Sequence, residues 1–166
     1  MSDLYEDLTG VLAAEADELR ALGPLLDEQE AALMRADAGR VAAVMFRQAP
    51  VLRRLLRLDQ RRQALVGAIA DALDVESRGL SLAALLERMP SAPAALRALP
   101  AELRGLLEAI DVRNRRNAFL IERAVACIEG LVREVMAPAP EPAPVYVASG
   151  RPAGRAVAAR LVDTSA

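Results

Sequence analysis

The sequence contains no lysine, no histidine and no tryptophan, and it has one cysteine among 166 residues. Histidine is the commonest acid–base group near neutral pH and the commonest metal ligand, so its absence disfavours proton-transfer catalysis and a zinc site. The single cysteine, Cys127, cannot form an internal disulfide, and its place in a helical pattern predicts a small buried side chain in a reducing compartment. We therefore expect neither enzymatic activity nor a bound cofactor or metal.

Long apolar runs and phosphate-binding loops are missing as well. The sequence has no stretch of about 18 uninterrupted apolar residues, and no basic segment with an apolar core follows Met1. The glycines at 150 and 154 lack the strand-to-helix setting of a phosphate loop. These absences predict a cytoplasmic protein with no signal peptide and no membrane insertion.

What is present is apolar periodicity and a division of charge. Hydrophobic residues make up 54% of the chain, which is enough for one compact domain. Residues 1–36 carry nine acidic residues and two arginines, whereas residues 37–73 carry seven arginines and three acidic residues. Oppositely charged neighbouring segments favour two paired helices, with the arginines between Arg53 and Arg62 facing the acidic helix. Nucleic-acid binding is the weaker interpretation, because the acidic partner would screen the arginines.

Two long amphipathic helices are predicted in the first half of the chain, over about 2–36 and 38–73. Apolar residues recur there at alternating spacings of three and four, with a few polar residues in the same track. Asp37 is the expected N-cap of the second helix. Gly23-Pro24 and Pro50 are expected to kink or split their helices. The two tracks are Leu8, Leu12, Glu15, Leu19, Leu22, Leu26, Gln29 and Leu33, then Val41, Val44, Gln48, Val51, Leu55, Leu58, Arg62, Leu65 and Ile69.

A third long helix is predicted over about 100–136, with Pro100 in its first turn. Between residues 73 and 100 the periodicity breaks into short pieces, which predicts a connector of one or two short helices. The track of the last helix runs for about five heptads in the manner of a coiled coil. Its members are Leu103, Leu107, Ile110, Asn114, Asn117, Ile121, Ala124, Ile128, Leu131 and Val135.

The fold class is therefore predicted as all-α, an antiparallel bundle or coiled coil of three long helices with short connector helices. Residues 1–136 would form the bundle. Residues 137–166 begin with alternating alanine and proline, which is typical of an extended spacer, and would form a flexible tail.

Asn114 and Asn117 interrupt the apolar track of the last helix. An amide buried among leucines is costly unless it has a hydrogen-bonding partner, and such residues often fix register or specify a partner. The alternative is that the helix is exposed there and both amides are hydrated. The sequence leaves both interpretations open.

Several short segments together resemble the FlgN-like family of flagellar export chaperones. The run from Asn114 to Ile121, with paired asparagines followed by Leu120, is similar to the family's last long helix. Tyr146 with Gly150, and the closing Arg160-Leu-Val-Asp163, are similar to its tail. The chain departs from the family in Pro50 and in its proline-rich linker.

The resemblance implies a chaperone that binds the C-terminal amphipathic helix of hook-associated proteins, at the hook–filament junction, and keeps them unassembled. It also implies delivery to the flagellar export gate and its ATPase. The alternative is a structural coiled-coil adaptor that homodimerises. The residues expected to contact partners are Asn114, Asn117, Leu120, Ile121, Ala124, Ile128, Leu131, Tyr146 and Gly150.

Overall fold

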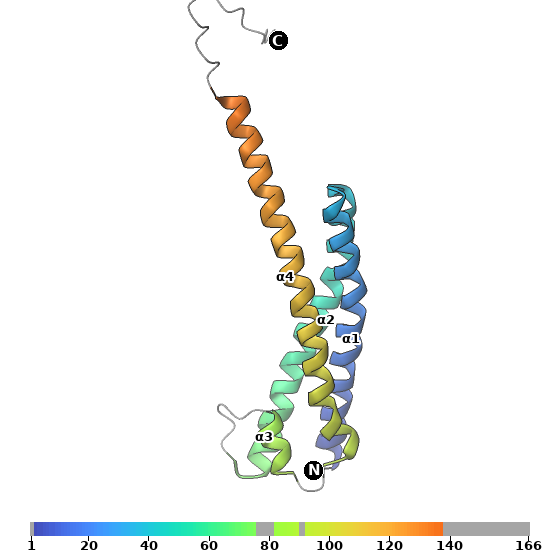
Figure 1. The fold of residues 1–166 in the computed structure, drawn as a ribbon. Helices are drawn as coiled ribbons and strands as arrows, with labels where there is room; N and C mark the ends of the chain where they lie inside the picture. Colours follow the sequence, from blue (N-terminus) through green and yellow to red (C-terminus); the bar gives the residue numbers. More distant parts are fainter. Residues whose placement is uncertain (1, 76–81, 90–91, 138–166) are drawn as a thin grey trace, which may run out of the picture. The chain divides into compact units, whose positions relative to one another are not determined.

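A computed structural model of the protein describes residues 2–75, 82–89 and 92–137. Over these residues the secondary structure is helical, which confirms the predicted all-α class and the three long helices. The helices are α1 (Ser2–Met34), α2 (Ala38–Ala72), α3 (Leu82–Glu87) and α4 (Ala94–Met136), shown in Figure 1.

The chain divides into two units, Met1–Cys127 and Ile128–Ala166, and the division falls within α4. The first unit contains the helical bundle. In the second unit the structure describes only the last turns of α4 and Ala137, so the predicted tail, residues 137–166, lies almost wholly outside the described residues.

A tight turn makes α1 and α2 antiparallel. Ala36 adopts a positive φ of 53°, and the amide of Asp37 donates to the carbonyl of Ala32 at 3.0 Å, which closes the end of α1. The side chain of Asp37 then accepts from the amide of Arg40 at 2.9 Å. The predicted N-cap is confirmed, and one residue helps to end α1 and begins α2.

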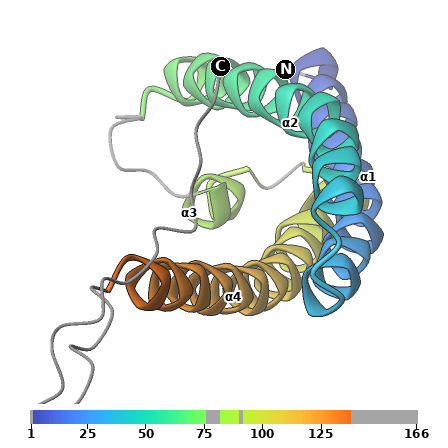
Figure 2. The ribbon, with the colours of Figure 1, turned by 90° about the horizontal axis from the view of Figure 1, so that it is seen from above.

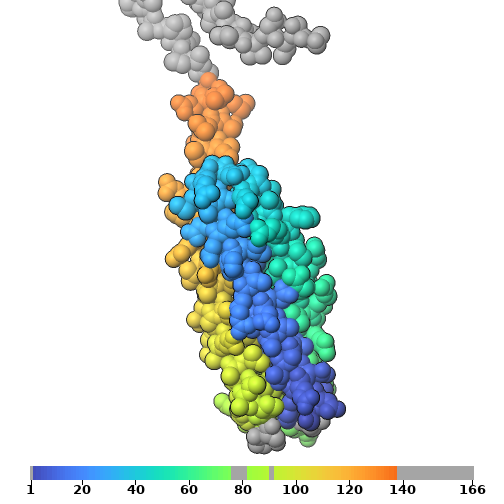
Figure 3. Space-filling model, turned by 90° about the vertical axis from the view of Figure 1, so that its right-hand side faces the viewer, coloured from blue at the N-terminus to red at the C-terminus, as the bar shows by residue number. Residues whose placement is uncertain are grey.

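Within the bundle, α1 lies between its two long neighbours. Seen along the helices, α2, α1 and the bundle part of α4 follow one another around an arc, with α3 inside it (Figure 2). The outer face shows α1 flanked by α2 and α4 (Figure 3). Because it packs on both sides, α1 buries thirteen residues, compared with five on the longer α2. The buried residues of α1 include Leu8, Leu12, Leu19, Leu22 and Leu26 from the predicted track.

The internal prolines do not split their helices. Both Pro24 and Pro50 lie inside continuous helices. A proline inside a helix costs about 3 kcal/mol through its missing donor and its ring. Leu25 and Leu26 follow Pro24 directly and are both buried, and each buried leucine contributes roughly 1.5–3 kcal/mol. The burial of Leu25 and Leu26 therefore outweighs the hydrogen bond that Pro24 cannot donate.

The predicted start of the last helix was wrong. α4 begins at Ala94, so Pro100 lies inside the helix and not in its first turn. Leu96 and Leu99 are both buried and continue the apolar track backwards from Leu103. As at Pro24, burial of two leucines offsets the defect that the proline introduces.

Candidate partner-binding surface

The exposed apolar residues of α4 gather on one face of its second half. Between residues 118 and 136 no side chain is buried, and only Leu120 is half-buried. Ile128 is 60% exposed although isoleucine is among the residue types most often buried. We call the following six residues the α4 stripe, because spacings of three, four and seven place them on one face. They are Ile121, Val125, Ile128, Leu131, Val132 and Val135.

The α4 stripe contains three of the predicted contact residues, Val135 from the predicted track, and two residues that the prediction missed. Ile121, Ile128 and Leu131 were expected. Val125 and Val132 follow Ile121 and Ile128 by four residues, which widens the apolar face, and that spacing was visible in the sequence. Ala124 is exposed on the same side of the helix. A face of this width suits packing in a helical bundle better than a narrow two-stranded seam.

Cys127 is exposed, contrary to its predicted burial. The helical pattern was right, but a pattern shows only that a face is apolar and does not show that another element covers it.

The two asparagines of α4 have different surroundings. Asn117 is buried, and its side-chain amide donates to the carbonyl of Leu26 at 3.1 Å and to Oε1 of Gln29 at 3.4 Å. Gln48 of α2 donates to the same Oε1 at 2.9 Å. Asn114 is exposed. The sequence left two interpretations open. Asn117 is a buried, hydrogen-bonded residue that fixes the helix register, whereas Asn114 is exposed to water.

This contact, which we call the amide cluster, joins α1, α2 and α4 through Gln29, Gln48 and Asn117. A one-residue shift of any of the three helices would place an amide against leucines, where an unpaired polar group costs about 1–3 kcal/mol. The cluster therefore fixes the register of the bundle immediately before the α4 stripe begins.

A second polar contact involves Glu15, which lies nearer the N-terminus of α1 than Gln29. Glu15 is buried and accepts from Nε of Arg62 at 3.1 Å, while Asp59 accepts from the same guanidinium. Burial raises the pKa of the Glu15 carboxyl, and the charge and hydrogen bond of Arg62 oppose that rise only in part. By contrast, the hydrogen bond from Arg47 is the main cause that lowers the pKa of Glu28.

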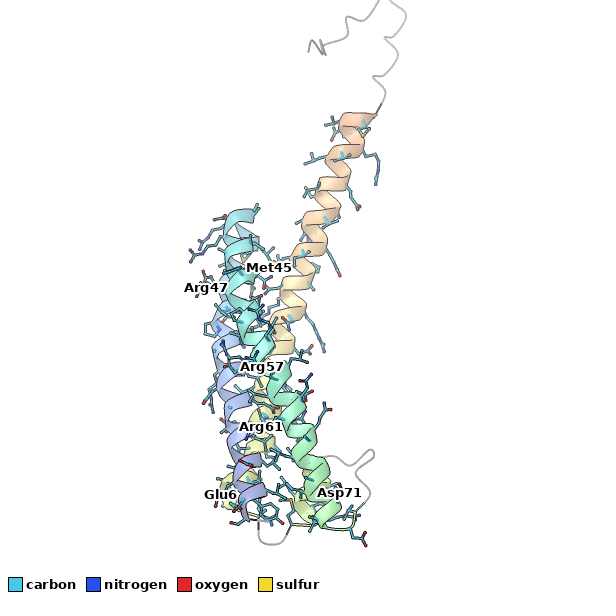
Figure 4. All side chains as sticks on the ribbon, turned by 180° about the vertical axis from the view of Figure 1, so that it is seen from behind. Glu6, Met45, Arg47, Arg57, Arg61 and Asp71 are labelled. Atoms are coloured by element: carbon cyan, nitrogen blue, oxygen red, sulfur yellow. The ribbon has the colours of Figure 1, made fainter. Side chains whose placement is uncertain are left out.

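Ion pairs along α1 and α2 confirm the predicted pairing of opposite charges. Arg47 contacts Glu28 at 2.7 Å, and Arg54 contacts Glu18 at 2.5 Å. Arg61, one turn from Arg57 in Figure 4, contacts Asp7 at 3.6 Å. Residues 47, 54 and 61 recur every seven positions, so they share the face of α2 that borders α1. The arginines of these pairs are about half exposed to solvent, so each pair contributes little to stability.

An apolar groove opens between α2 and α4, with a volume of about 750 Å³. Its floor is formed by α1 and one end of it by α3. Sequence periodicity did not show this groove, because it results from the spacing between helices. The lining residues are Leu12, Glu15, Leu19, Leu55, Leu56, Asp59, Arg62, Leu82, Ala83, Pro100, Leu103, Arg104, Leu107 and Glu108.

Other expectations concern residues and sites away from these surfaces. Tyr146 and Gly150 lie outside the described residues. In the described part of the chain, no helix is long and apolar enough to cross a membrane. Nor do the described ranges contain a group of three or more potential metal ligands.

A family model described as FlgN protein matches residues 1–154. The chain belongs to the FlgN family. FlgN proteins are flagellar export chaperones and not enzymes, so the chaperone role indicated by the paired asparagines and the tail is confirmed at the level of the family. No curated protein and no solved structure matches the chain.

The amide cluster predicts unequal effects for the two asparagines of this FlgN protein. Asn117→Ala should lower the free energy of unfolding by about 1–2 kcal/mol, because Gln29 and the Leu26 carbonyl lose a buried donor. Asn114→Ala, the matched control, should change it by about 0.5 kcal/mol or less, because that side chain is exposed. Urea denaturation measures both. Equal effects would show that the cluster does not stabilise the bundle.

Glu15 and Glu28 predict opposite pH dependences. The folded state binds the Glu15 proton more tightly than the unfolded state, so Glu15 contributes stability at low pH that is lost as pH rises through its raised pKa. The lowered pKa of Glu28 gives a contribution present at neutral pH and lost as pH falls through it. From about pH 4 to about pH 8, the thermal midpoint of the wild type should therefore fall relative to Glu15→Gln and rise relative to Glu28→Gln. Parallel profiles would contradict both assignments.

Proposed function

We propose that this FlgN protein is a cytoplasmic chaperone that binds the C-terminal amphipathic helix of hook-associated proteins at the hook–filament junction. Bound in this way, the client cannot use its own apolar helix to assemble early. The chaperone then delivers the client to the flagellar export gate and its ATPase. The family supports the chaperone role, and the α4 stripe supports this mode of binding.

The α4 stripe carries the proposal because it is a helix face without a covering element in the described chain. Amphipathic helices bind such faces through residues at i, i+3, i+4 and i+7. Leu120 and Ala124 border the stripe and would add to the contact. Asn117 lies one turn before the stripe and holds α4 to α1, so its role would be to position the surface.

Tyr146 and Gly150 are proposed to act in the tail rather than in the bundle. A tyrosine combines a large apolar ring with a hydroxyl group, which suits it to contacts at protein interfaces. We assign Tyr146 to contact with the client or with the export machinery, and Gly150 to the same segment.

Ile128→Asp should weaken client binding by at least tenfold. The probe is a synthetic peptide of the C-terminal helix of a hook–filament junction protein from the same cell, and calorimetry gives the affinity. A charged carboxylate in an apolar contact loses hydration without a partner, and every 1.4 kcal/mol is a factor of ten. Helical circular dichroism should not change, because the Ile128 side chain is already largely exposed.

Val112→Asp is the matched control for this test. Val112 is also β-branched, is half-exposed, and lies on a different face of α4 from the stripe. Its substitution should leave the affinity for the peptide within about twofold, a difference well below 1 kcal/mol. Equal weakening by the two variants would place the contact elsewhere, and unfolding of the Ile128 variant would show that the stripe belongs to an internal core.

A further inference from the structure

The inner side of the bundle has the layout of a four-helix bundle in which the fourth helix is very short. α3 lies inside the arc formed by the three long helices (Figure 2). It has six residues, and Leu85, Leu86 and the following Met89 are almost completely buried. α3 therefore shows within this chain that a helix packs well at the fourth position.

Beyond α3, the residues that the structure describes leave an apolar groove at the fourth position. Leu82 and Ala83 of α3 form one end of it, and leucines from the other three helices continue along it. A helix about 10 Å wide with a rise of 5.4 Å per turn occupies roughly 400 Å³ per turn. The volume of about 750 Å³ thus accommodates roughly two turns of helix, which is comparable in length to α3.

The wall formed by α2 remains apolar past the groove. Met45, Leu52 and Leu56 are each at least half exposed, and their spacings of seven and four place them on one face. Figure 4 shows Met45 and Arg47 on opposite sides of α2. Because Arg47 pairs with Glu28 of α1, this apolar face is distinct from the ion-paired edge.

The size of the α4 stripe indicates that a client would gain from a second contact. Its six side chains are between 41% and 84% exposed, so a client helix that packs on them buries only their outer parts. Association also costs translational and rotational freedom and the ordering of side chains. A second apolar contact would therefore raise the affinity for the client.

We propose that the groove between α2 and α4 is a second docking site, in which a short amphipathic helix of the client lies beyond α3 as the fourth helix of the bundle. The proposal rests on the proposed chaperone function and adds a site to it. Continuity with the contact between α2 and α3 supports a helix as the occupant, because Leu55 and Leu56 of α2 line the groove together with Leu82 and Ala83 of α3.

The charge of the groove indicates which side chains the client helix carries. The groove is lined by three carboxylates and two guanidinium groups, a formal net charge of −1, and Glu15 and Asp59 share one arginine. An arginine or lysine on the polar edge of the client helix, next to Asp59, would balance this charge. The second half of α4, residues 118–136, has three glutamates and two arginines. It carries the same net charge as the groove, so α4 of a second copy fits less well.

Tryptophan substitution tests occupancy directly, because the chain has no tryptophan of its own. The probe is a tryptophan-free C-terminal peptide of a hook–filament junction protein, long enough to contain the helix for the α4 stripe and a second short helix. In Leu56→Trp, the emission should shift to the blue when the peptide is added, since the indole moves from water into an apolar contact. In Val112→Trp, which does not line the groove, the emission should not shift. A peptide that binds without moving the Leu56→Trp emission would overturn the proposal.

Aspartate substitutions measure how much the groove contributes to the affinity for the peptide. Each of the two helices, α2 and α4, also provides a control position. Leu56→Asp on α2 and Leu107→Asp on α4 replace half-exposed side chains, so the bundle should fold, and each should weaken peptide binding by at least tenfold. The controls Phe46→Asp and Val112→Asp replace exposed residues that do not line the groove, and should stay within twofold of the wild type.

The outcomes separate the site from the function. If the wild type does not bind the peptide at all, the proposed function fails. If it binds and only Ile128→Asp weakens binding, the function stands and the groove proposal is overturned. If the groove variants change only the mass of the free chain, a second copy occupies the groove, and this also overturns the proposal.

Discussion

The structure depends on one constraint, which is that α1 must pack on both sides. Its leucines occupy a face wide enough for two neighbours, and α2 and α4 each cover part of it. Both α2 and α4 pack against α1, and among the described residues α3 is the element that covers part of their inner faces. The apolar groove and the exposed side of α2 follow from this arrangement, since α3 contributes only six residues to the fourth position.

Polar contacts inside the bundle set the register that apolar packing leaves loose. Leucines can slide past one another at modest cost, but Gln29 can satisfy Gln48 and Asn117 in only one alignment. The ion pair between Glu15 and Arg62 likewise fixes the alignment of α1 and α2 near the groove. This pairing removes water from the Glu15 carboxylate, which is energetically unfavourable. A core with leucines in place of these polar groups would be more stable. The polar groups instead fix the alignment of α4 on α1, and so they determine which residues of α4 remain outside the packed bundle.

The sequence predicted the class of fold, the Asp37 cap and the pairing of acidic and basic helices, because each depends on spacing within one segment. It also showed the three amides of the amide cluster, together with Glu15 and Arg62, as irregularities in apolar tracks. It could not show which irregularities would meet, because that depends on the alignment between helices. For the same reason it predicted Ile121, Ile128 and Leu131 as contact residues but did not show the groove. It also predicted that Cys127 is buried, whereas Cys127 is exposed. The proposed roles of Tyr146 and Gly150, which lie outside the described residues, come from the resemblance and from the chemistry of tyrosine.

A chaperone that works in this way binds its client with the same apolar packing that would otherwise complete its own bundle. The account therefore requires one chain to accept one client, and not another copy of itself in the client's place. Light scattering coupled to size exclusion, applied to the full chain mixed with a purified full-length hook–filament junction protein, measures this directly. The account predicts one species whose mass is that of one 17.7 kDa chain plus one client. Separate elution of the two proteins, with the chain associating only with itself, would contradict it and favour a homodimeric coiled-coil adaptor.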